Sequence, residues 1–153
     1  MAGVDDQAGF AAGFNPKVAE ALQSAARVEG HFPAYLGIEV ERAEPGRITC
    51  ALTVRPEHIT PVVGVVHGGV IAALVDHTLS IAVYPLVEPG KWVATVEFKL
   101  NYLGSVKEGV IRAVGTVERL GKRVAVVRVE VENAGASVAL AQGTLYVRDP
   151  PGT

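Results

Sequence analysis

One almost uninterrupted apolar stretch, Val65 to Val87, restricts what this chain can fold into more than any other feature. It reads VVHGGVIAALVDHTLSIAVYPLV, and at 3.6 residues per turn apolar side chains recur on every side of a helix. The Gly68-Gly69 pair allows tight chain entry, and Pro85 ends the pattern. The length and periodicity predict a helix over residues 67–83 that is buried on all sides.

The segments before this helix predict one short helix and one hairpin. Asn15 followed by Pro16 is typical of a helix start and predicts an amphipathic helix over residues 15–29. Residues 35–54 form two alternating runs around Pro45-Gly46, which predict a β-hairpin that includes Tyr35 in its first strand.

The segments after the helix alternate between apolar and polar residues in four successive runs. In the first run, Trp92 to Tyr102, the alternation predicts that all even-numbered residues share one face of a strand. The predicted class is therefore α+β, an antiparallel sheet of five to six strands wrapped around one long central helix.

Composition excludes several kinds of partner. The chain has 14 Lys and Arg against 16 Asp and Glu with no basic stripe, which argues against nucleic acid binding. The only cysteine, Cys50, alternates with apolar residues and has no partner for a disulfide, as expected in a reducing compartment.

The acidic first ten residues do not resemble a signal peptide. His67, Asp76 and His77 interrupt the apolar stretch before it reaches the length of about 20 residues that a bilayer requires. We expect a cytoplasmic protein with no membrane partner.

Asp76 is the first candidate for chemistry because it is an acid inside an apolar helix. Such a carboxylate is desolvated or faces a cavity or an interface, and a carboxylate that loses water becomes a stronger base. The alternative is a structural Asp that pairs with a buried cation or hydroxyl, or that reaches solvent at a sheet edge. His77 lies on a different face of the helix and is not its automatic partner.

Gly68-Gly69 at the helix start is the second candidate. Free N–H groups at a helix N-terminus stabilise a developing oxyanion, although a tight turn explains the glycines equally well. Gly68 and Asp76 are eight residues apart, about 12 Å along a helix, so they cannot contact the same carbonyl. If both are catalytic, Asp76 must meet Gly68 of a second chain across a two-fold axis.

The sequence offers little support for other chemistries. His67 and His77 are ten positions apart, with no Glu-x-x-His or Cys-x-x-Cys, so no metal site is expected. Serine-triad and nucleotide-binding motifs are missing as well. Five basic residues at strand ends and turns are either solvated charges or, in part, contacts for phosphate groups: Lys107, Arg119, Lys122, Arg123 and Arg148.

The segment HGGVIAALVDHTLSIA resembles the His-Gly-Gly-x6-Asp core of hotdog-fold acyl-CoA thioesterases of the phenylacetic-acid-pathway and thioesterase superfamily member 2 type. LGIEV before it, and TVEFKLNYLGSVKEG and AQGTLYV after it, extend the resemblance over residues 30–148 of a single domain, 1–153. It implies a hotdog fold, a homodimer that often pairs into a homotetramer, and hydrolysis of an acyl-CoA. No cofactor is expected, because coenzyme A is part of the substrate.

The resemblance also implies roles for individual residues. Asp76 is the general base or the nucleophile, and the Gly68 N–H polarises the thioester carbonyl from the other subunit. Thr95 falls where the family often has a Ser or Thr that places water, and His67 falls on the His that supports the thioester end. Further candidates for substrate binding are Gly69, Pro61, His77, Lys122 and Arg123, and for the acyl pocket Tyr35, Leu36, Pro61 and Tyr84.

Two positions depart from the family pattern. Pro61 stands six residues before His67, where Asn or Gln is frequent, and Gly104 stands where a basic residue is frequent. Thr60 and His58 are the polar residues near Pro61 that could replace the missing amide.

Two alternative functions stay open at this point. The same fold could serve as a non-catalytic module that binds acyl-CoA or regulates its use. GHFPAYLG, with His31, resembles the His-Phe-Pro of hotdog dehydratases, although there the motif leads into the central helix and here it precedes the first hairpin.

Overall fold

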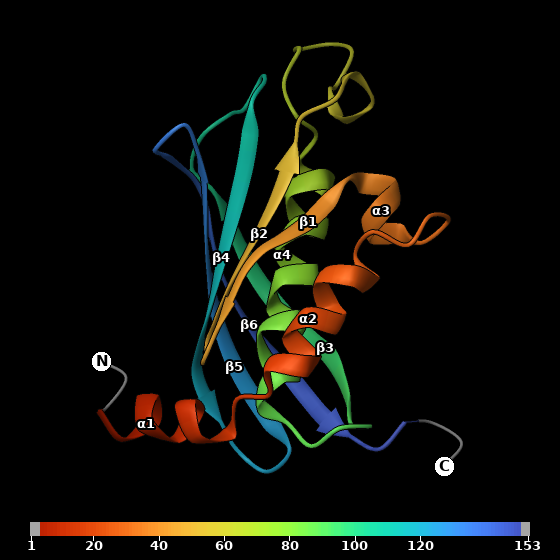
Figure 1. Cartoon of the computed structure of the whole chain (residues 1–153). Helices are drawn as coiled ribbons and strands as arrows, with labels where there is room; N and C mark the ends of the chain where they lie inside the picture. Colours follow the sequence, from red (N-terminus) through yellow and green to blue (C-terminus); the bar gives the residue numbers. More distant parts are fainter. Residues whose placement is uncertain (1–3, 151–153) are drawn as a thin grey trace.

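The computed structural model describes residues 4–150, in which six antiparallel strands form one sheet and α4 (Gly68–Val83) lies across one face of it (Figure 1). The strand order is β1-β2-β4-β5-β6-β3. The strands are β1 (Ile38–Glu44), β2 (Arg47–Thr53), β3 (Trp92–Tyr102), β4 (Val110–Leu120), β5 (Val124–Asn133) and β6 (Ala136–Arg148). The predicted α+β class and the hotdog architecture are confirmed.

Three shorter helices and two 3₁₀ turns complete the chain: α1 (Val4–Gly13), α2 (Pro16–Ala25), α3 (Phe32–Leu36), η1 (Pro56–His58) and η2 (Tyr84–Leu86). The predicted helix over residues 15–29 begins as expected, because Asn15 Oδ1 accepts hydrogen bonds from the N–H groups of Lys17 (3.1 Å) and Val18 (3.3 Å). It ends at Ala25, four residues earlier than predicted.

The prediction of a strand from Tyr35 is wrong at its beginning. Residues 32–36 form α3 instead, with Pro33 in its first turn and Gly37 at φ 76° after its end. The first strand therefore begins only at Ile38.

Side chains of α4 fill the centre of the core, which lies between this helix and the sheet. Leu74, Val75 and Leu79 are fully buried. Two sheet glycines let the helix approach closely, since a Cβ on Gly115 would lie 2.9 Å from Thr78 Cγ2 and one on Gly143 would lie 2.9 Å from Leu79 Cδ1.

The helical segment Gly68–Leu86 is, within the described residues, the single one long and apolar enough to cross a membrane, despite its interrupting polar residues. Half of its most apolar window is buried in the fold, and α4 is the core helix.

The prediction that α4 is buried on all sides is wrong for a single chain. Gly69, Ala72, Ala73, Asp76 and Ser80 recur at helical spacing on one face, and all of them are partly or fully exposed. Their side chains are small or polar, which the overall apolar character of the segment conceals. A stripe of α4 therefore remains uncovered along the face that carries Asp76.

The even-numbered residues of β3 do not share one face. The pairing with β6 shifts between Thr95 and Glu97, so a β-bulge at Val96 reverses the alternation. Val93 and Thr95 before the bulge therefore lie on the same face as Phe98 after it. This shift turns Thr95 toward α4.

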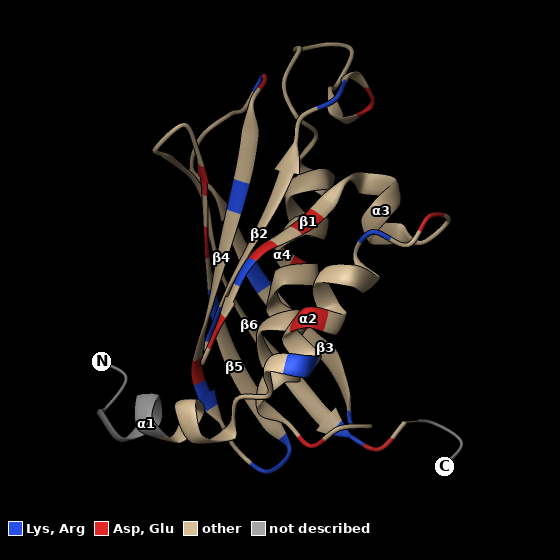
Figure 2. Cartoon of the chain, in the orientation of Figure 1, with Lys and Arg blue, Asp and Glu red and all other residues tan. Residues whose placement is uncertain are grey.

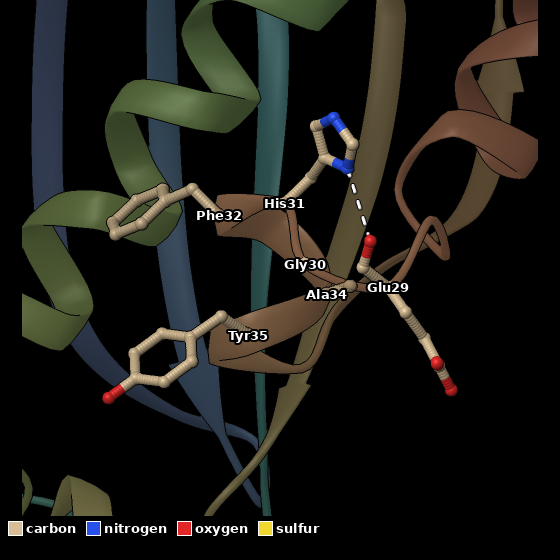
Figure 3. A pocket seen from close by; sticks show the side chains of 6 residues that line it. All are labelled: Glu29, Gly30, His31, Phe32, Ala34 and Tyr35. Atoms are coloured by element: carbon tan, nitrogen blue, oxygen red, sulfur yellow. Dashed lines mark hydrogen bonds between the residues drawn. The ribbon is translucent and has the colours of Figure 1, made fainter.

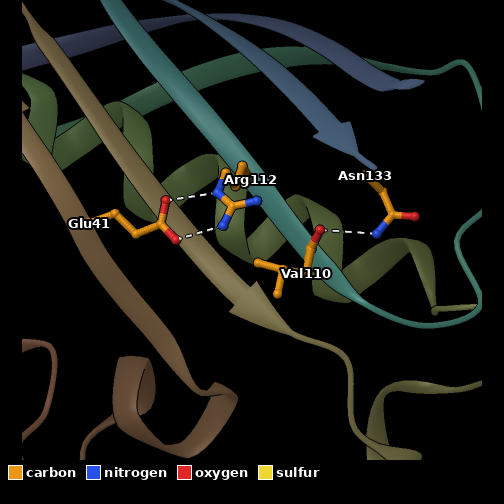
Figure 4. Close-up of polar contacts among 4 residues, drawn as sticks. All are labelled: Glu41, Val110, Arg112 and Asn133. Carbon is orange, nitrogen blue, oxygen red and sulfur yellow. Dashed lines mark hydrogen bonds and ion pairs between the residues drawn. The ribbon is translucent and has the colours of Figure 1, made fainter. Parts of the chain in front are cut away.

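Charged residues occur along the strands and in the turns at the ends of the sheet (Figure 2). Arg112 on β4 donates two hydrogen bonds to the Glu41 carboxylate on β1, at 2.8 and 3.1 Å (Figure 4). The Asn133 amide nitrogen donates to the carbonyl oxygen of Val110. The Arg112–Glu41 pair is exposed to solvent, so it adds little to the stability of the fold.

Candidate active site

The N-terminal turn of α4 leaves one backbone donor free. His67 is the N-cap, and its Nδ1 accepts a hydrogen bond from the Gly69 N–H (2.9 Å). The N–H of Val70 donates to the carbonyl oxygen of His67. The Gly68 N–H, at the first helical position, has no intrahelical acceptor, and no hydrogen bond in the described chain uses it.

Gly68 is held close to β3. The Tyr102 hydroxyl donates a 2.8 Å hydrogen bond to the carbonyl oxygen of Gly68. A Cβ on Gly68 would lie only 3.1 Å from the Tyr102 ring, a tight contact for any larger residue. The contact between Gly68 and Tyr102, at the C-terminal end of β3, therefore holds the free N–H group in position.

Asp76 lies in the middle of α4, half-buried on the uncovered stripe. It makes no hydrogen bond or ion pair with any residue of the described chain. The structural alternative, an acid paired with a buried cation or hydroxyl, is therefore wrong for the single chain. The carboxylate is left available to a ligand or a second subunit.

Two hydroxyl groups lie beside the Asp76 face. Ser80 is one helical turn beyond Asp76, and its Oγ lies 3.2 Å from Thr95 Oγ1 on β3. The structure thus brings Thr95 to the stripe that carries Asp76. Sequence reasoning missed Ser80, although its position four residues after Asp76 was the available signal.

A cavity of about 340 Å³ opens beside the start of α4. Three residues predicted to contact the substrate, Pro61, His67 and Gly69, line it together with Leu36. The rest of its lining combines four apolar residues with three polar ones: Phe32, Ile59, Val70 and Ala73, and Glu57, His58 and Thr60. Tyr35 and Tyr84, also expected at the acyl pocket, do not line this cavity.

The polar residues near Pro61 already have partners. His58 is buried, and its Nδ1 accepts from the Arg55 N–H (3.1 Å). Burial and the adjacent Arg55 guanidinium lower the pKa of His58. Thr60 Oγ1 donates to the carbonyl oxygen of Val65 (3.1 Å). Neither side chain is free to take the place of an amide at Pro61 without breaking one of these contacts.

His77 is mostly buried on the flank of α4 and does not line the cavity. Its Nε2 is inaccessible and has no hydrogen-bond partner in the described chain. Burial lowers the pKa of His77, and the neighbouring Asp76 carboxylate opposes that shift. Burial therefore favours the neutral form of the imidazole.

Lys122 and Arg123 lie in the turn between β4 and β5, away from the cavity. Glu29, Phe32 and Tyr35 border another hollow, of about 440 Å³, where His31 Nδ1 lies 3.2 Å from the carbonyl oxygen of Glu29 (Figure 3). His31 precedes α3 and not α4, unlike the His of the dehydratase motif. Among the side chains that the structure describes, no three His, Cys, Asp or Glu gather closely enough to hold a metal ion.

The sequence profile of the Thioesterase superfamily matches residues 63–139, from the turn before α4 into β6. The chain belongs to this superfamily. It is a thioester hydrolase, and the resemblance noted for the His-Gly-Gly-x6-Asp segment is confirmed.

Curated relatives support the assignment of this thioesterase. It is 32% identical over 115 residues to human acyl-coenzyme A thioesterase 13, with 74% of this chain and 81% of that protein covered. It is 30% identical over 96 residues to a 1,4-dihydroxy-2-naphthoyl-CoA hydrolase of Listeria monocytogenes, with 63% and 77% covered.

Solved structures agree with the fold and the family. A thioesterase from Haemophilus influenzae superposes with a TM-score of 0.78 at 27% identity, with 85% of this chain and 90% of that chain covered. A mutant of the phenylacetic acid degradation protein PaaI from Thermus thermophilus gives a TM-score of 0.67 at 29% identity, with 74% and 95% covered.

Proposed function

We propose that this thioesterase hydrolyses acyl-CoA, at a site that joins Asp76 of one subunit to the Gly68 N–H of the partner subunit. The observation that carries the proposal is the unpaired Asp76 carboxylate on the uncovered stripe of α4. The names of the relatives, an acyl-coenzyme A thioesterase and a naphthoyl-CoA hydrolase, support coenzyme A as the thiol.

The arrangement of donor and acid favours a two-subunit site. Gly68 and Asp76 are eight residues apart on one helix, about 12 Å along its axis, which is too far for one carbonyl. Ala72 is the midpoint between them. If two α4 helices pack antiparallel about Ala72, the Gly68 of each subunit faces the Asp76 of the other.

Exposed parts of the chain suit such a homodimer. β3 is an edge strand of the sheet, and it carries the exposed apolar residues Val96 and Tyr102. An unpaired edge of this kind is a template for a second strand, so two β3 strands can join the sheets of two subunits. The small side chains of the α4 stripe allow the second helix to approach. We further propose that dimers pair into a homotetramer.

The proposed chemistry needs no metal ion. The Gly68 N–H donates to the thioester carbonyl oxygen and stabilises the negative charge that develops there. As a general base, Asp76 takes a proton from water while the oxygen of that water attacks the carbonyl carbon. The tetrahedral intermediate then expels the CoA thiolate, which receives the proton. Thr95 and Ser80, whose hydroxyl oxygens lie 3.2 Å apart, would orient the water.

The alternative role of Asp76 is that of nucleophile. Its carboxylate oxygen would attack the carbonyl carbon and displace CoA thiolate, leaving an acyl-aspartate anhydride that water then hydrolyses. The two routes differ in the source of oxygen. A single turnover in ¹⁸O-labelled water places ¹⁸O in the acid product if Asp76 is a base. Label found in the Asp76 carboxylate identifies the nucleophilic route, in which water attacks the aspartyl carbonyl of the anhydride.

The substrate is proposed to occupy both ends of the site. The cavity lined by Pro61, His67 and Gly69 would take the acyl group. His77 would contact the substrate from the flank of α4. Lys122 and Arg123 would hold CoA phosphates. The free, buried Cys50 is consistent with a cytoplasmic enzyme.

The test is thiol release from a panel of acyl-CoA substrates of different chain length and aromaticity. Asp76→Asn is expected to lower kcat by roughly 10²–10⁴-fold, the range for loss of a general acid–base group. Glu39→Gln, the same chemical change at an exposed acid on β1, is the matched control. An unchanged rate in Asp76→Asn, or tight binding of intact acyl-CoA without turnover by the natural protein, would contradict the proposal.

A further inference from the structure

A basic groove lies at one end of the sheet, beyond the C-terminal end of α4. A hollow of about 300 Å³ is bordered by Lys91, Lys122, Arg123 and Arg148. A second hollow, of about 320 Å³, continues from it to Leu86 in η2. Lys91, Lys122 and Val147 line both, so the two hollows form one groove. Figure 2 marks Lys and Arg positions in blue on the ribbon at this end of the sheet.

Positive charge prevails in this groove. Asp149 neutralises Lys91 through a 2.7 Å ion pair, and Glu88 lies on the rim of the second hollow. Lys122, Arg123 and Arg148 form no ion pair with any side chain that the structure describes. Three uncompensated cations around a concave surface attract an anion that carries more than one negative charge.

An aromatic ring holds one of these cations in place. Trp92 and Arg148 are paired across β3 and β6, and the Arg148 guanidinium carbon lies 4.6 Å from the centre of the Trp92 ring. This stacking orients the guanidinium while its N–H edges stay available for phosphate oxygens. Trp92 remains 38% exposed, so a ligand in the groove would change its surroundings.

The groove is within reach of the reacting carbonyl. Tyr84 is eight residues beyond Asp76, about 12 Å along the helix direction. The Tyr84 hydroxyl accepts a 3.2 Å hydrogen bond from the Val93 N–H, next to Trp92. Lys91, two residues before Val93, lines the groove. The pantetheine arm of CoA, equivalent to about five extended residues, spans about 15–18 Å.

We propose that this groove binds the phosphorylated adenosine end of the acyl-CoA substrate, with Arg148 and Trp92 completing a site around Lys122 and Arg123. The inference rests on the proposed function for the identity of the substrate. Lys122 and Arg123 contact the phosphates, and the Arg148–Trp92 pair borders the nucleoside.

The single tryptophan of the chain makes binding measurable without turnover. Adenosine 3′,5′-bisphosphate, which contains no thioester, is titrated into the protein while Trp92 fluorescence is recorded. A saturable change is expected, and it should weaken as salt is added because the contacts are ionic. Inorganic phosphate, titrated in parallel, should bind at least roughly tenfold more weakly because it lacks the second phosphate and the nucleoside.

Charge-removing variants locate the residues that bind the phosphates. Lys122→Gln with Arg123→Gln should raise the Kd for the bisphosphate by roughly tenfold or more for each ionic hydrogen bond to phosphate that the substitutions remove. The control is Arg27→Gln with Lys17→Gln, which removes the same charge from exposed positions outside the groove. Equal Kd values in the two double variants, equal affinity for inorganic phosphate, or no fluorescence change would overturn the inference.

A second measurement separates this inference from the proposed function. Acyl-pantetheine has the thioester but no nucleotide. The ratio of kcat/KM for acyl-CoA to that for acyl-pantetheine should fall by roughly tenfold or more in the Lys122/Arg123 double variant. If neither thioester is hydrolysed, the proposed function fails. If both are hydrolysed but the ratio does not fall, only the groove is excluded.

Discussion

Replacing Gly68 by proline removes one N–H group from the candidate site while the helix start is preserved. Proline fits the first position of a helix, where its missing N–H has no intrahelical partner. The preceding residue, His67, has φ −63° and ψ 134°, the extended conformation that a following proline requires. The helix should therefore form normally.

The expected loss of activity follows from the role of that N–H. Loss of one oxyanion donor costs about 10²–10³-fold in kcat, or about 2.7–4 kcal/mol of transition-state stabilisation. Gly68→Ala is the matched control, since its Cβ makes the same 3.1 Å contact with the Tyr102 ring but the N–H remains. The comparison between proline and alanine thus isolates the hydrogen bond from the steric contact.

The assay is thiol release from acyl-CoA, with thermal unfolding recorded for both variants. We expect Gly68→Pro to be roughly 10²–10³-fold slower than Gly68→Ala at similar Tm. Equal kcat values in two folded variants would refute the assignment of the Gly68 N–H as the oxyanion donor.

Three further predictions concern stability and reactivity. Burial raises the pKa of Cys50 to about 12, so iodoacetamide should leave the folded protein unmodified at pH 8 and label it after unfolding; rapid labelling of folded protein, seen by mass spectrometry, would be inconsistent with the core. Asn15→Ala removes both cap contacts of α2 and should lower the free energy of unfolding in urea by about 1 kcal/mol, whereas the exposed substitution Ser24→Ala should change it by less; equal effects would argue against the cap. His77 has a lowered pKa in the folded state, so the unfolded state binds more protons as the pH falls through 6.5, and the free energy of unfolding should decrease there. His77→Gln should show a shallower decrease, and an identical pH profile would contradict the buried neutral imidazole.

The central helix was predictable because several local signals agree. His67, the glycines and Pro85 mark its ends, and the structure places it at Gly68–Val83, one residue from the predicted start. Its exposed stripe was not predictable from the apolar pattern, since Ala72 and Ala73 count as apolar but leave little surface to bury. Helical spacing from Asp76 would have identified Ser80 on the same face.

Three other features of the structure could not be predicted from the sequence, each for its own reason. The bulge at Val96 reverses the faces of β3, and no residue in the run from Trp92 to Tyr102 marks it, because β-branched residues suit either face of a strand. α3 is only five residues long, too short to produce a helical period. The groove at the end of the sheet joins residues from three separate segments, so its cations were visible in the sequence only as individual strand-end charges.

Mixing two inactive variants tests most directly whether each site draws on two subunits. Asp76→Asn and Gly68→Pro are purified separately, mixed, unfolded and refolded together so that subunits exchange. In a mixed dimer one site contains both mutations and the other contains neither, so random pairing should restore roughly a quarter of the natural activity. If the mixture stays as inactive as either variant alone while mixed dimers are present, Asp76 and Gly68 do not act across the subunit interface.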